Sequence, residues 1–190
     1  YAFLLANFAV LLHRLSDQDD LVIGIPAAGQ AATGRRDLIG HAVNILPLRC
    51  TVDGSEPFAQ TLSRMRADLL DAFEHQRYTF GTLLKRLAMP RDPARLPLVN
   101  VLFNLDRELG PDQAQFPGLE FQLDTLPRSF ENFELFVNAV QLGGGGLSLE
   151  CQFNSDLFDA ETIEAWLDAY ATLLRSACAD PARSGDALGM

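Results

Sequence analysis

The sequence predicts an α/β fold in which a mixed β-sheet is flanked by helices. Stretches whose apolar residues recur every three to four positions, as in a helix, are interspersed with short β-branched runs of the kind found in strands. The chain has 190 residues, of which 48% are apolar and 21% charged, and this is the composition of a globular protein with a packed core. Neither an internal repeat nor a shift in composition divides the chain, so we expect one domain-sized unit.

The first elements are a helix and two strands. Apolar side chains within residues 1–15 share one helical face, which predicts an amphipathic helix. Residues 21–25 are apolar and β-branched, and they should form a buried strand that stops at Pro26. Strand character returns over residues 38–50, where Pro47 indicates that part of this segment is an edge strand or a bulge.

The middle of the chain contributes two helices and a strand. Apolar residues spaced by three and four predict a strongly amphipathic helix over residues 58–73, with Ser55 as its cap and Pro57 in its first turn. A shorter helix should follow over residues 79–87. After a proline-rich connection, the apolar run 98–103 predicts another strand.

The last part of the chain is expected to be strands followed by a helix. Residues 119–126 alternate in part and suggest a strand. Residues 133–142 and 147–153 are joined by four glycines, so they should form a β-hairpin. A final helix should begin after Asp159, which can cap it.

Charge and cysteine content exclude several classes of partner. The formal net charge is −10, so the surface as a whole repels nucleic-acid backbones and anionic lipids, and we expect neither nucleic acid nor membrane as a partner. The longest apolar stretch, residues 1–12, falls short of the roughly 20 residues that span a bilayer. Cys50, Cys151 and Cys178 are odd in number and widely spaced, which fits a reducing cytoplasm better than a disulfide framework.

Spacing alone identifies no catalytic or metal-binding residue. His13, His41 and His75 stand in no recognisable site, and His13 fits a local contact with the carbonyls at a helix end. The chain has no His-x-x-x-His pair and no Gly-x-Ser-x-Gly nucleophile motif. We therefore expect no catalytic residue and no metal ligand among these residues.

Several amides stand inside apolar strand segments. Asn44, Asn100 and Asn104 each have apolar neighbours on both sides. Because a buried amide without a hydrogen bond costs about 1–3 kcal/mol, each of them either ties down neighbouring backbone or faces a polar cavity. Together they suggest a tunnel wall or the floor of a cleft.

Five short blocks occur in order along the chain: QDDLVIGIP (18–26), IGHAVNILPLR (39–49), HQRYTF (75–80), RDPARLPL (91–98) and NSDLFD (154–159). Their sequences, order and spacing resemble the later motifs of condensation domains from nonribosomal peptide synthetases. The resemblance extends over essentially the whole chain. In the second block the family often has Gly-x-Phe-Val-Asn, whereas this chain has His41 and Ala42 before the retained Asn44.

The family's catalytic signature, His-His-x-x-x-Asp-Gly, belongs to the N-terminal half of the domain, and this chain has no adjacent histidines. The chain therefore resembles the C-terminal lobe alone, with the lobe at residues 1–179 and a linker-like tail at residues 180–190. The resemblance implies one lobe of a two-lobed fold like that of chloramphenicol acetyltransferase, with a reaction tunnel between the lobes. It also implies that the lobe is inactive alone and that its uncovered apolar face promotes self-association.

The implied reaction is amide-bond formation in the biosynthesis of peptide antibiotics and other secondary metabolites. Donor and acceptor groups would be carried as thioesters on the phosphopantetheine arms of carrier domains, with no cofactor bound directly by this lobe. The implied partners are an N-terminal lobe, carrier domains and an adjacent adenylation domain. Two alternatives stay open, a non-catalytic relative that recruits carrier or tailoring proteins and an epimerising relative.

The resemblance also implies roles for individual residues. Asn44 and the strand with Asn100, Asn104 and Asp106 would line or support the tunnel. Arg95 would hold a loop through hydrogen bonds of its guanidinium group. The segment between residues 108 and 128 would reach toward the other lobe.

Overall fold

The structure is a computed structural model that describes residues 1–30, 34, 37–89, 92, 95–108, 118–119 and 131–190. Its helices and strands are, in chain order, α1 (Ala2–Ser16), β1 (Asp20–Ala28), β2 (Val43–Thr51), α3 (Phe58–Glu74), α4 (Phe80–Leu87), β3 (Val101–Arg107), β4 (Leu135–Gln141), β5 (Leu147–Phe153), α5 (Ala160–Ala179) and the short 3-10 helix η1 (Gly185–Ala187). Within this part of the chain, no helix combines the length and the apolar character needed to cross a membrane.

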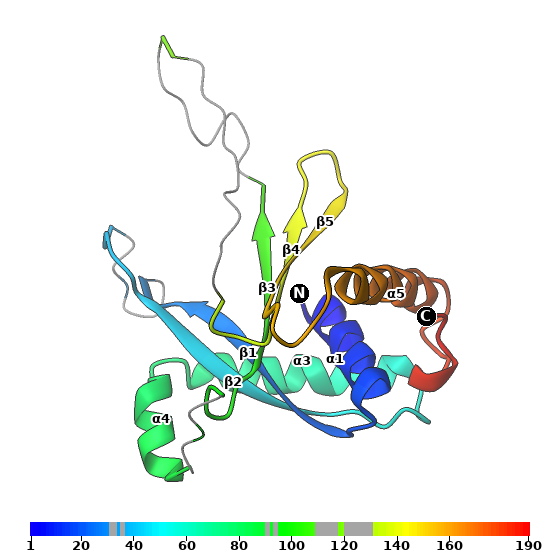
Figure 1. The fold of residues 1–190 in the computed structure, drawn as a ribbon, viewed down its shortest axis with the longest axis horizontal. Coiled ribbons are helices and arrows are strands. Elements are labelled where there is room, and N and C mark those ends of the chain that lie inside the picture. Colours follow the sequence, from blue (N-terminus) through cyan, green and yellow to red (C-terminus); the bar gives the residue numbers. More distant parts are fainter. Residues whose placement is uncertain (31–33, 35–36, 90–91, 93–94, 109–117, 120–130) are drawn as a thin grey trace.

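The strands form one mixed sheet in the order β2-β1-β3-β4-β5. The outer pairs β1–β2 and β4–β5 are antiparallel, whereas β1–β3 and β3–β4 are parallel. The β1–β3 pairing is short and joins Ile23 with Val101 and Gly24 with Leu102. Beyond Gly24, the β1–β2 pair leans away from the other strands (Figure 1). The predicted mixed sheet with flanking helices and the predicted β4–β5 hairpin are confirmed.

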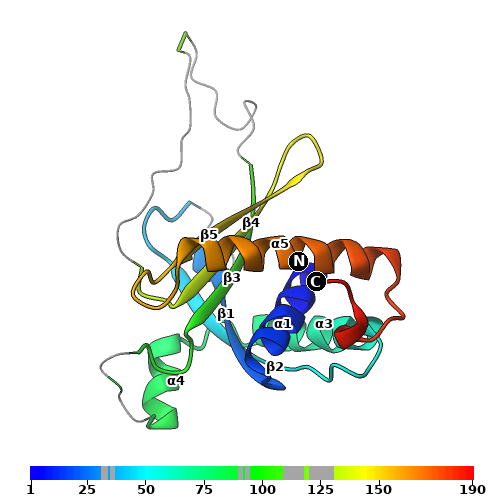
Figure 2. The same cartoon turned by 45° about the vertical axis from the view of Figure 1, so that its right-hand side comes forward.

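Three helices cover one face of the sheet. α3 packs against β2, while α1 contacts β1 and lies between α3 and α5. α5 runs across β4 and β5 (Figure 2). Because side chains alternate along a strand, every second residue of each strand faces these helices, and the others lie on the opposite face, which we call the open face.

Aromatic side chains fill the centre of the core between the sheet, α1 and α5. The ring of Phe103 on β3 lies 5.1 Å from that of Phe8 and 6.4 Å from that of Tyr170, measured between centroids. All three side chains are almost fully buried. The hydroxyl of Tyr170 donates a hydrogen bond to the carbonyl of Leu4 over 2.8 Å, so its polar end is also paired.

A close approach on the open face explains the glycine in β1. Val99 and Leu102 are buried there, outside the main core cluster. A Cβ atom at Gly24 would lie 2.4 Å from a methyl carbon of Leu102 and 2.5 Å from one of Val99. A side chain at this position would therefore force Leu102 and Val99 to shift from where they cover β1.

Several element boundaries differ from those predicted. β3 begins at Val101 rather than at Leu98, because Leu98 has a φ of 69° and Val99 donates to the carbonyl of Pro97, a tight turn that delays the strand. β1 continues past Pro26 to Ala28, which is possible because β1 is no longer paired with β3 there. The predicted strand at residues 119–126 lies outside the described residues except for Leu119.

The proline and cap predictions had mixed outcomes. Pro47 lies in β2, the outermost strand, and pairs in register with Gly24 without a bulge, so the edge-strand prediction is confirmed. Ser55 is not the cap of α3, which starts after Pro57. Instead the amide and hydroxyl of Ser55 both donate to Asp53, and these hydrogen bonds lower the pKa of that carboxyl group.

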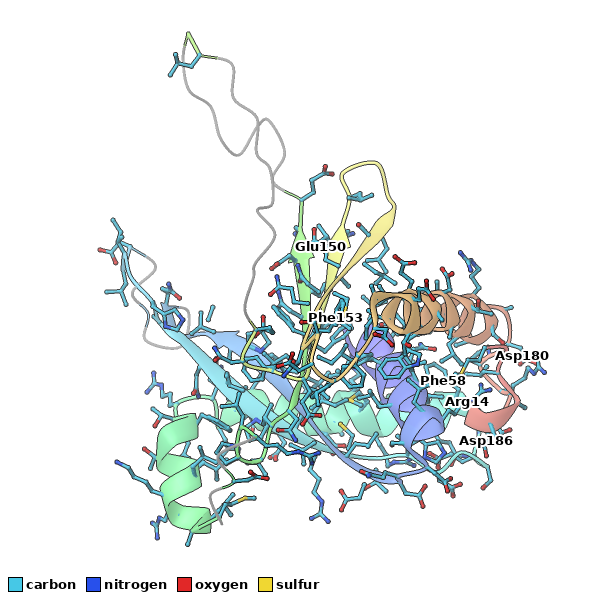
Figure 3. All side chains as sticks on the ribbon, in the orientation of Figure 1. Arg14, Phe58, Glu150, Phe153, Asp180 and Asp186 are labelled. Atoms are coloured by element: carbon cyan, nitrogen blue, oxygen red, sulfur yellow. The ribbon has the colours of Figure 1, made fainter. Side chains whose placement is uncertain are left out.

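The last residues lie against the start of α3. Pro57 forms an isolated antiparallel bridge with Ser184, and the amide of Phe58 donates to the carbonyl of Arg183 over 2.8 Å. The side chain of Leu188 is buried at 2% exposure, and Arg14 donates to its carbonyl over 2.8 Å. Figure 3 shows Arg14 and Asp186 close together at this end of the molecule. The stretch predicted as a linker-like tail is thus docked by its backbone and by one apolar side chain.

Candidate functional site

Three polar side chains form a row across the open face. Asn104 on β3 lies opposite Asn138 on β4, which in turn lies opposite Glu150 on β5. Asn104 Nδ2 donates to Asn138 Oδ1 over 3.0 Å, and Asn138 Nδ2 donates to Glu150 Oε2 over 3.3 Å. All three residues are partly exposed, and Figure 3 labels Glu150. We call Asn104, Asn138 and Glu150 the polar row.

Two other predicted site residues lie along the same strand. Asp106 follows Asn104 by two positions, so it lies on the same face, and it is exposed. Asn100 directly precedes β3, and its carbonyl accepts a hydrogen bond from the amide of Glu134 over 2.9 Å. Its side-chain Oδ1 is buried and has no hydrogen-bond partner in the described part of the chain. The structure therefore brings Asn104 and Asp106 to one face and places Asn100 just before the same strand, where its Oδ1 is an unused acceptor among the described residues.

Arg95 lies on the loop before β3. Its Nε is 3.5 Å from Oε1 of Glu134, and 63% of its side chain is exposed. An exposed ion pair of this kind contributes at most about 1 kcal/mol to stability. The contact joins the loop to the start of β4, which is compatible with the structural role expected of Arg95.

Asn44 is separated from the polar row. It lies near the start of β2, in step with Leu46 and Leu48, which face the helices. Its Nδ2 donates to the carbonyls of Gln76 and Tyr78 over 3.0 and 3.1 Å, and its Oδ1 accepts from the amide of Phe80 over 3.0 Å. The whole amide group thus holds the connection between α3 and α4 against β2.

We expect Asn44→Ala to lower the free energy of unfolding by about 1–3 kcal/mol, because the backbone groups of the α3–α4 connection lose three hydrogen bonds. Urea unfolding followed by circular dichroism would measure the change. Val43→Ala, at a neighbouring side chain that is 46% exposed, is the matched control and should change stability by less than about 0.5 kcal/mol. An Asn44→Ala loss no larger than that of the control would show that the three bonds are not important for stability.

Asn44 also borders a groove. This groove offers about 800 Å³ of space beside the α3–α4 connection. Its walls carry mainly apolar side chains, among them Leu38, Val43, Ile45 and Phe80. The groove and the polar row belong to different parts of the structure, so the predicted site residues do not form one cluster.

His13 and His75 contact neighbouring backbone and carboxylate groups. His13 Nδ1 lies 3.1 Å from the carbonyl oxygen of Gln18 and 3.2 Å from Oδ1 of Asp19, and its Nε2 lies 3.6 Å from Oδ1 of Asp186. It therefore links the end of α1 to the start of β1 and to η1. His75 is exposed, and a hydrogen bond to the carbonyl of Asp71 raises its pKa. Among the described residues, no three His, Cys, Asp or Glu side chains are grouped so that they could hold a metal ion.

The cysteines differ sharply in exposure, which predicts their reactivity. Burial raises the pKa of both Cys50 and Cys151 to about 12, whereas Cys178 is exposed on α5. Because the thiolate is the reactive form, iodoacetamide at pH 8 should modify Cys178 at least about tenfold faster than the other two. Peptide mass spectrometry after timed labelling measures this, and unfolding in urea should abolish the difference. Equal rates in the folded chain would contradict it.

Comparison with known proteins places this geometry in a family. The family model described as "Condensation domain" matches residues 1–190. The chain belongs to the condensation domain family. The resemblance predicted from the five ordered blocks is therefore confirmed.

Curated relatives of this condensation domain chain are large synthetases. It is 38% identical over 182 residues to phosphinothricin tripeptide synthetase PhsB of Streptomyces viridochromogenes, a match that covers 93% of this chain and 15% of that protein. It is 33% identical over 183 residues to bacitracin synthase 3 of Bacillus licheniformis, covering 95% of this chain and 3% of that protein. The chain therefore spans a small fraction of the relatives it matches.

Solved structures share the fold. The X-domain from teicoplanin biosynthesis aligns with a TM-score of 0.87 at 21% identity, over 100% of this chain and 43% of that one. A four-domain nonribosomal peptide synthetase bound to AMP and glycine aligns with a TM-score of 0.86 at 26% identity, over 98% of this chain and 15% of that one. The mixed sheet with helices on one face is thus the fold of condensation domain structures.

Two residues of the polar row, Asn138 and Glu150, were not predicted from the sequence. Each is a polar residue at an alternate position of an apolar strand, the same signal that identified Asn104. What the sequence could not supply was the register that aligns them across β3, β4 and β5. The pattern was therefore visible strand by strand, but not as a row.

Proposed function

We propose that this chain forms one wall of the reaction tunnel of a condensation domain that makes amide bonds in nonribosomal peptide synthesis. The amine of an acceptor group attacks the thioester carbonyl of a donor group, each held on the phosphopantetheine arm of a carrier domain. A C–N bond forms, the C–S bond breaks, and the departing sulfur leaves as a thiol that carries the proton lost by the amine. The histidine signature comes from an N-terminal lobe, and this chain alone is inactive.

The single observation that carries the assignment of the wall is the polar row on the open face. Among the described residues, helices cover the other face of the sheet, so the open face is the one that a substrate can reach. The row places hydrogen-bonding groups at the middle of that face, between the half-buried apolar side chains of Phe136 and Val140. Membership of the condensation domain family supports the reaction class.

The test is reconstitution of the parent protein. The full synthetase module containing this chain is incubated with a donor carrier loaded with an acyl or aminoacyl group and an acceptor carrier loaded with an amino acid. We expect an amide product on the acceptor carrier, detected by mass spectrometry of the phosphopantetheine arm. No product, under conditions in which a known module of the family forms one, would overturn the proposal.

The same experiment separates the alternatives. A recruiting relative would bind carrier or tailoring proteins without forming product. An epimerising relative would invert the α-carbon of a tethered residue without making a new bond, and chiral analysis of the released product would reveal it. The carrier and adenylation partners of the parent are tested in the same assay, because each must load or present a substrate.

We also propose that the isolated chain self-associates through surfaces that the parent protein covers. Several large apolar side chains are exposed, among them Ile39 at 98%, Leu70 at 62% and Leu157 at 52%. Apolar groups of this kind favour association where they form a patch. Light scattering on the isolated chain should give an apparent mass above 20.9 kDa that rises with concentration. A monomer at all concentrations would contradict this expectation.

A further inference from the structure

Glu150 determines which way the amide groups of Asn138 and Asn104 are oriented in the polar row. An ionised carboxylate can only accept hydrogen bonds, whereas an asparagine amide can donate from Nδ2 and accept at Oδ1. Glu150 therefore requires Nδ2 of Asn138 to point toward it, over 3.3 Å. That orientation turns Oδ1 of Asn138 toward β3, where it accepts from Nδ2 of Asn104 over 3.0 Å. Both amides are thus oriented by one carboxylate.

The row ends in an unused acceptor. With Nδ2 of Asn104 directed at Asn138, its Oδ1 is left on the side away from β4. In the part of the chain that the structure describes, this oxygen has no hydrogen-bond donor. The neighbouring strand offers none by pairing, because the β1–β3 ladder ends at Gly24 and Leu102, before it reaches Asn104. Beyond that pairing, the β1–β2 pair leans away from β3 (Figure 1).

Without the carboxylate the direction would be lost. The two ends of an asparagine amide are nearly the same size, so Asn138 and Asn104 could each rotate by half a turn with little steric cost. Rotation of both would present Nδ2 of Asn104, a donor, at the end of the row. Glu150 prevents this because the rotated Asn138 would place an amide oxygen against a carboxylate oxygen.

We propose that Glu150, acting through Asn138, holds Oδ1 of Asn104 as a fixed hydrogen-bond acceptor for the attacking amine of the acceptor substrate. This inference rests on the proposed function. Asn104 is the residue that touches the substrate, and Asn138 and Glu150 are positioning residues. The amine offers an N–H in every reaction cycle, and one N–H bonded to Oδ1 leaves the lone pair of the nitrogen free to attack.

The chemistry of the other substrate argues against it as the ligand. The reacting part of the donor is a thioester, whose carbonyl oxygen is itself an acceptor. Two acceptor oxygens facing each other repel, so a fixed Oδ1 disfavours the thioester and selects an N–H group. The row therefore favours the amine of the acceptor substrate, which has an N–H to donate, over the thioester of the donor substrate, which has only an acceptor oxygen.

The test uses the full parent module with loaded carriers. Glu150→Gln keeps the size of the side chain but allows it to donate, so the direction of the row is no longer enforced. We expect the KM for the aminoacyl acceptor carrier to rise about three- to tenfold, with the KM for the donor carrier unchanged. Asn104→Ala should raise the KM for the acceptor carrier at least as much, again with the KM for the donor carrier unchanged. Thermal unfolding of each variant should match the parent.

Two comparisons make the result decisive. If Glu150 acts only through Asn104, the double variant Asn104→Ala with Glu150→Gln should be no worse than Asn104→Ala alone. Ser148→Ala, on the same face of β5 but outside the row, is the matched control and should leave both KM values unchanged. Three results would each overturn the inference: effects of the two substitutions on the acceptor KM that add in the double variant, an equal rise in the donor and acceptor KM values, or an unchanged acceptor KM. Absence of product with the unaltered module would instead overturn the proposed function and with it this inference.

Discussion

Replacing Phe103 by alanine should lower the free energy of unfolding by about 3–5 kcal/mol. The side chain is fully buried and lies between α1 and α5, where its ring meets those of Phe8 and Tyr170 at centroid distances of 5.1 and 6.4 Å. Tyr1 also stacks near it, at 5.9 Å. Removing the ring leaves a cavity bordered by aromatic groups of α1, of α5 and of the residue just before α1, and this cavity cannot close without moving a helix.

Urea unfolding, with tryptophan fluorescence and circular dichroism as independent probes, measures this change. Leu70→Ala on α3 is the matched control, because that apolar side chain is 62% exposed and its truncation should cost less than about 0.5 kcal/mol. A loss below about 1 kcal/mol for Phe103→Ala would mean that the three-ring cluster does not hold the helices on the sheet.

The helices were predictable because their signal is local. The amphipathic spacing that places α1 and α3 depends on residues within each helix, and the observed ranges differ from the predicted ranges by at most one residue at each end, although Ser55 does not cap α3. β2 shows the opposite case. Apolar character begins at Leu38, yet the strand begins at Val43, and Leu38 and Ile39 are 42% and 98% exposed. An apolar run does not reveal whether a neighbouring strand exists to pair with it.

The candidate site was predictable in kind but not in arrangement. An amide inside an apolar strand must be paired or face a polar space, and this principle identified both Asn44 and Asn104. Which of the two outcomes applies depends on distant residues. Asn44 finds its partners more than 30 positions away, at Gln76, Tyr78 and Phe80, and its amide is fully used. Asn104 meets another side chain instead and, among the described residues, keeps an acceptor free.

Amino-acid composition also does not predict contacts made by backbone groups. Residues 180–190 carry the proline, glycine and charged residues typical of a linker. In the structure their amides and carbonyls pair with those of residues 54–59, including Gly185 N to the carbonyl of Glu56 and Asp186 N to that of Gly54. Such pairing depends on backbone groups that every residue has, so no side-chain pattern announces it. The boundary between lobe and tail stays a prediction.

Deleting residues 181–190 should therefore destabilise the chain by at least about 3 kcal/mol. The deletion exposes the site that Leu188 fills, a side chain with 2% exposure, and leaves the amides of Phe58 and Ala59 without the carbonyls of Arg183 and Pro181. It also removes Asp186, whose carboxylate approaches His13 at the end of α1. The start of α3 and the end of α1 therefore both lose their contacts with residues 181–190.

Two point variants show which part of this effect comes from the apolar contact. Leu188→Ala should by itself lower the free energy of unfolding by about 2–4 kcal/mol, because it leaves a cavity at a core position that is only 2% exposed. Met190→Ala, at a side chain that is 45% exposed, is the control and should have little effect. Urea unfolding measures all three chains, and hydrogen exchange of the first turn of α3 should accelerate in the truncated one. If the truncated chain unfolds at the same urea concentration as the full chain, residues 181–190 are an appended linker and the stability of the remaining residues does not depend on them.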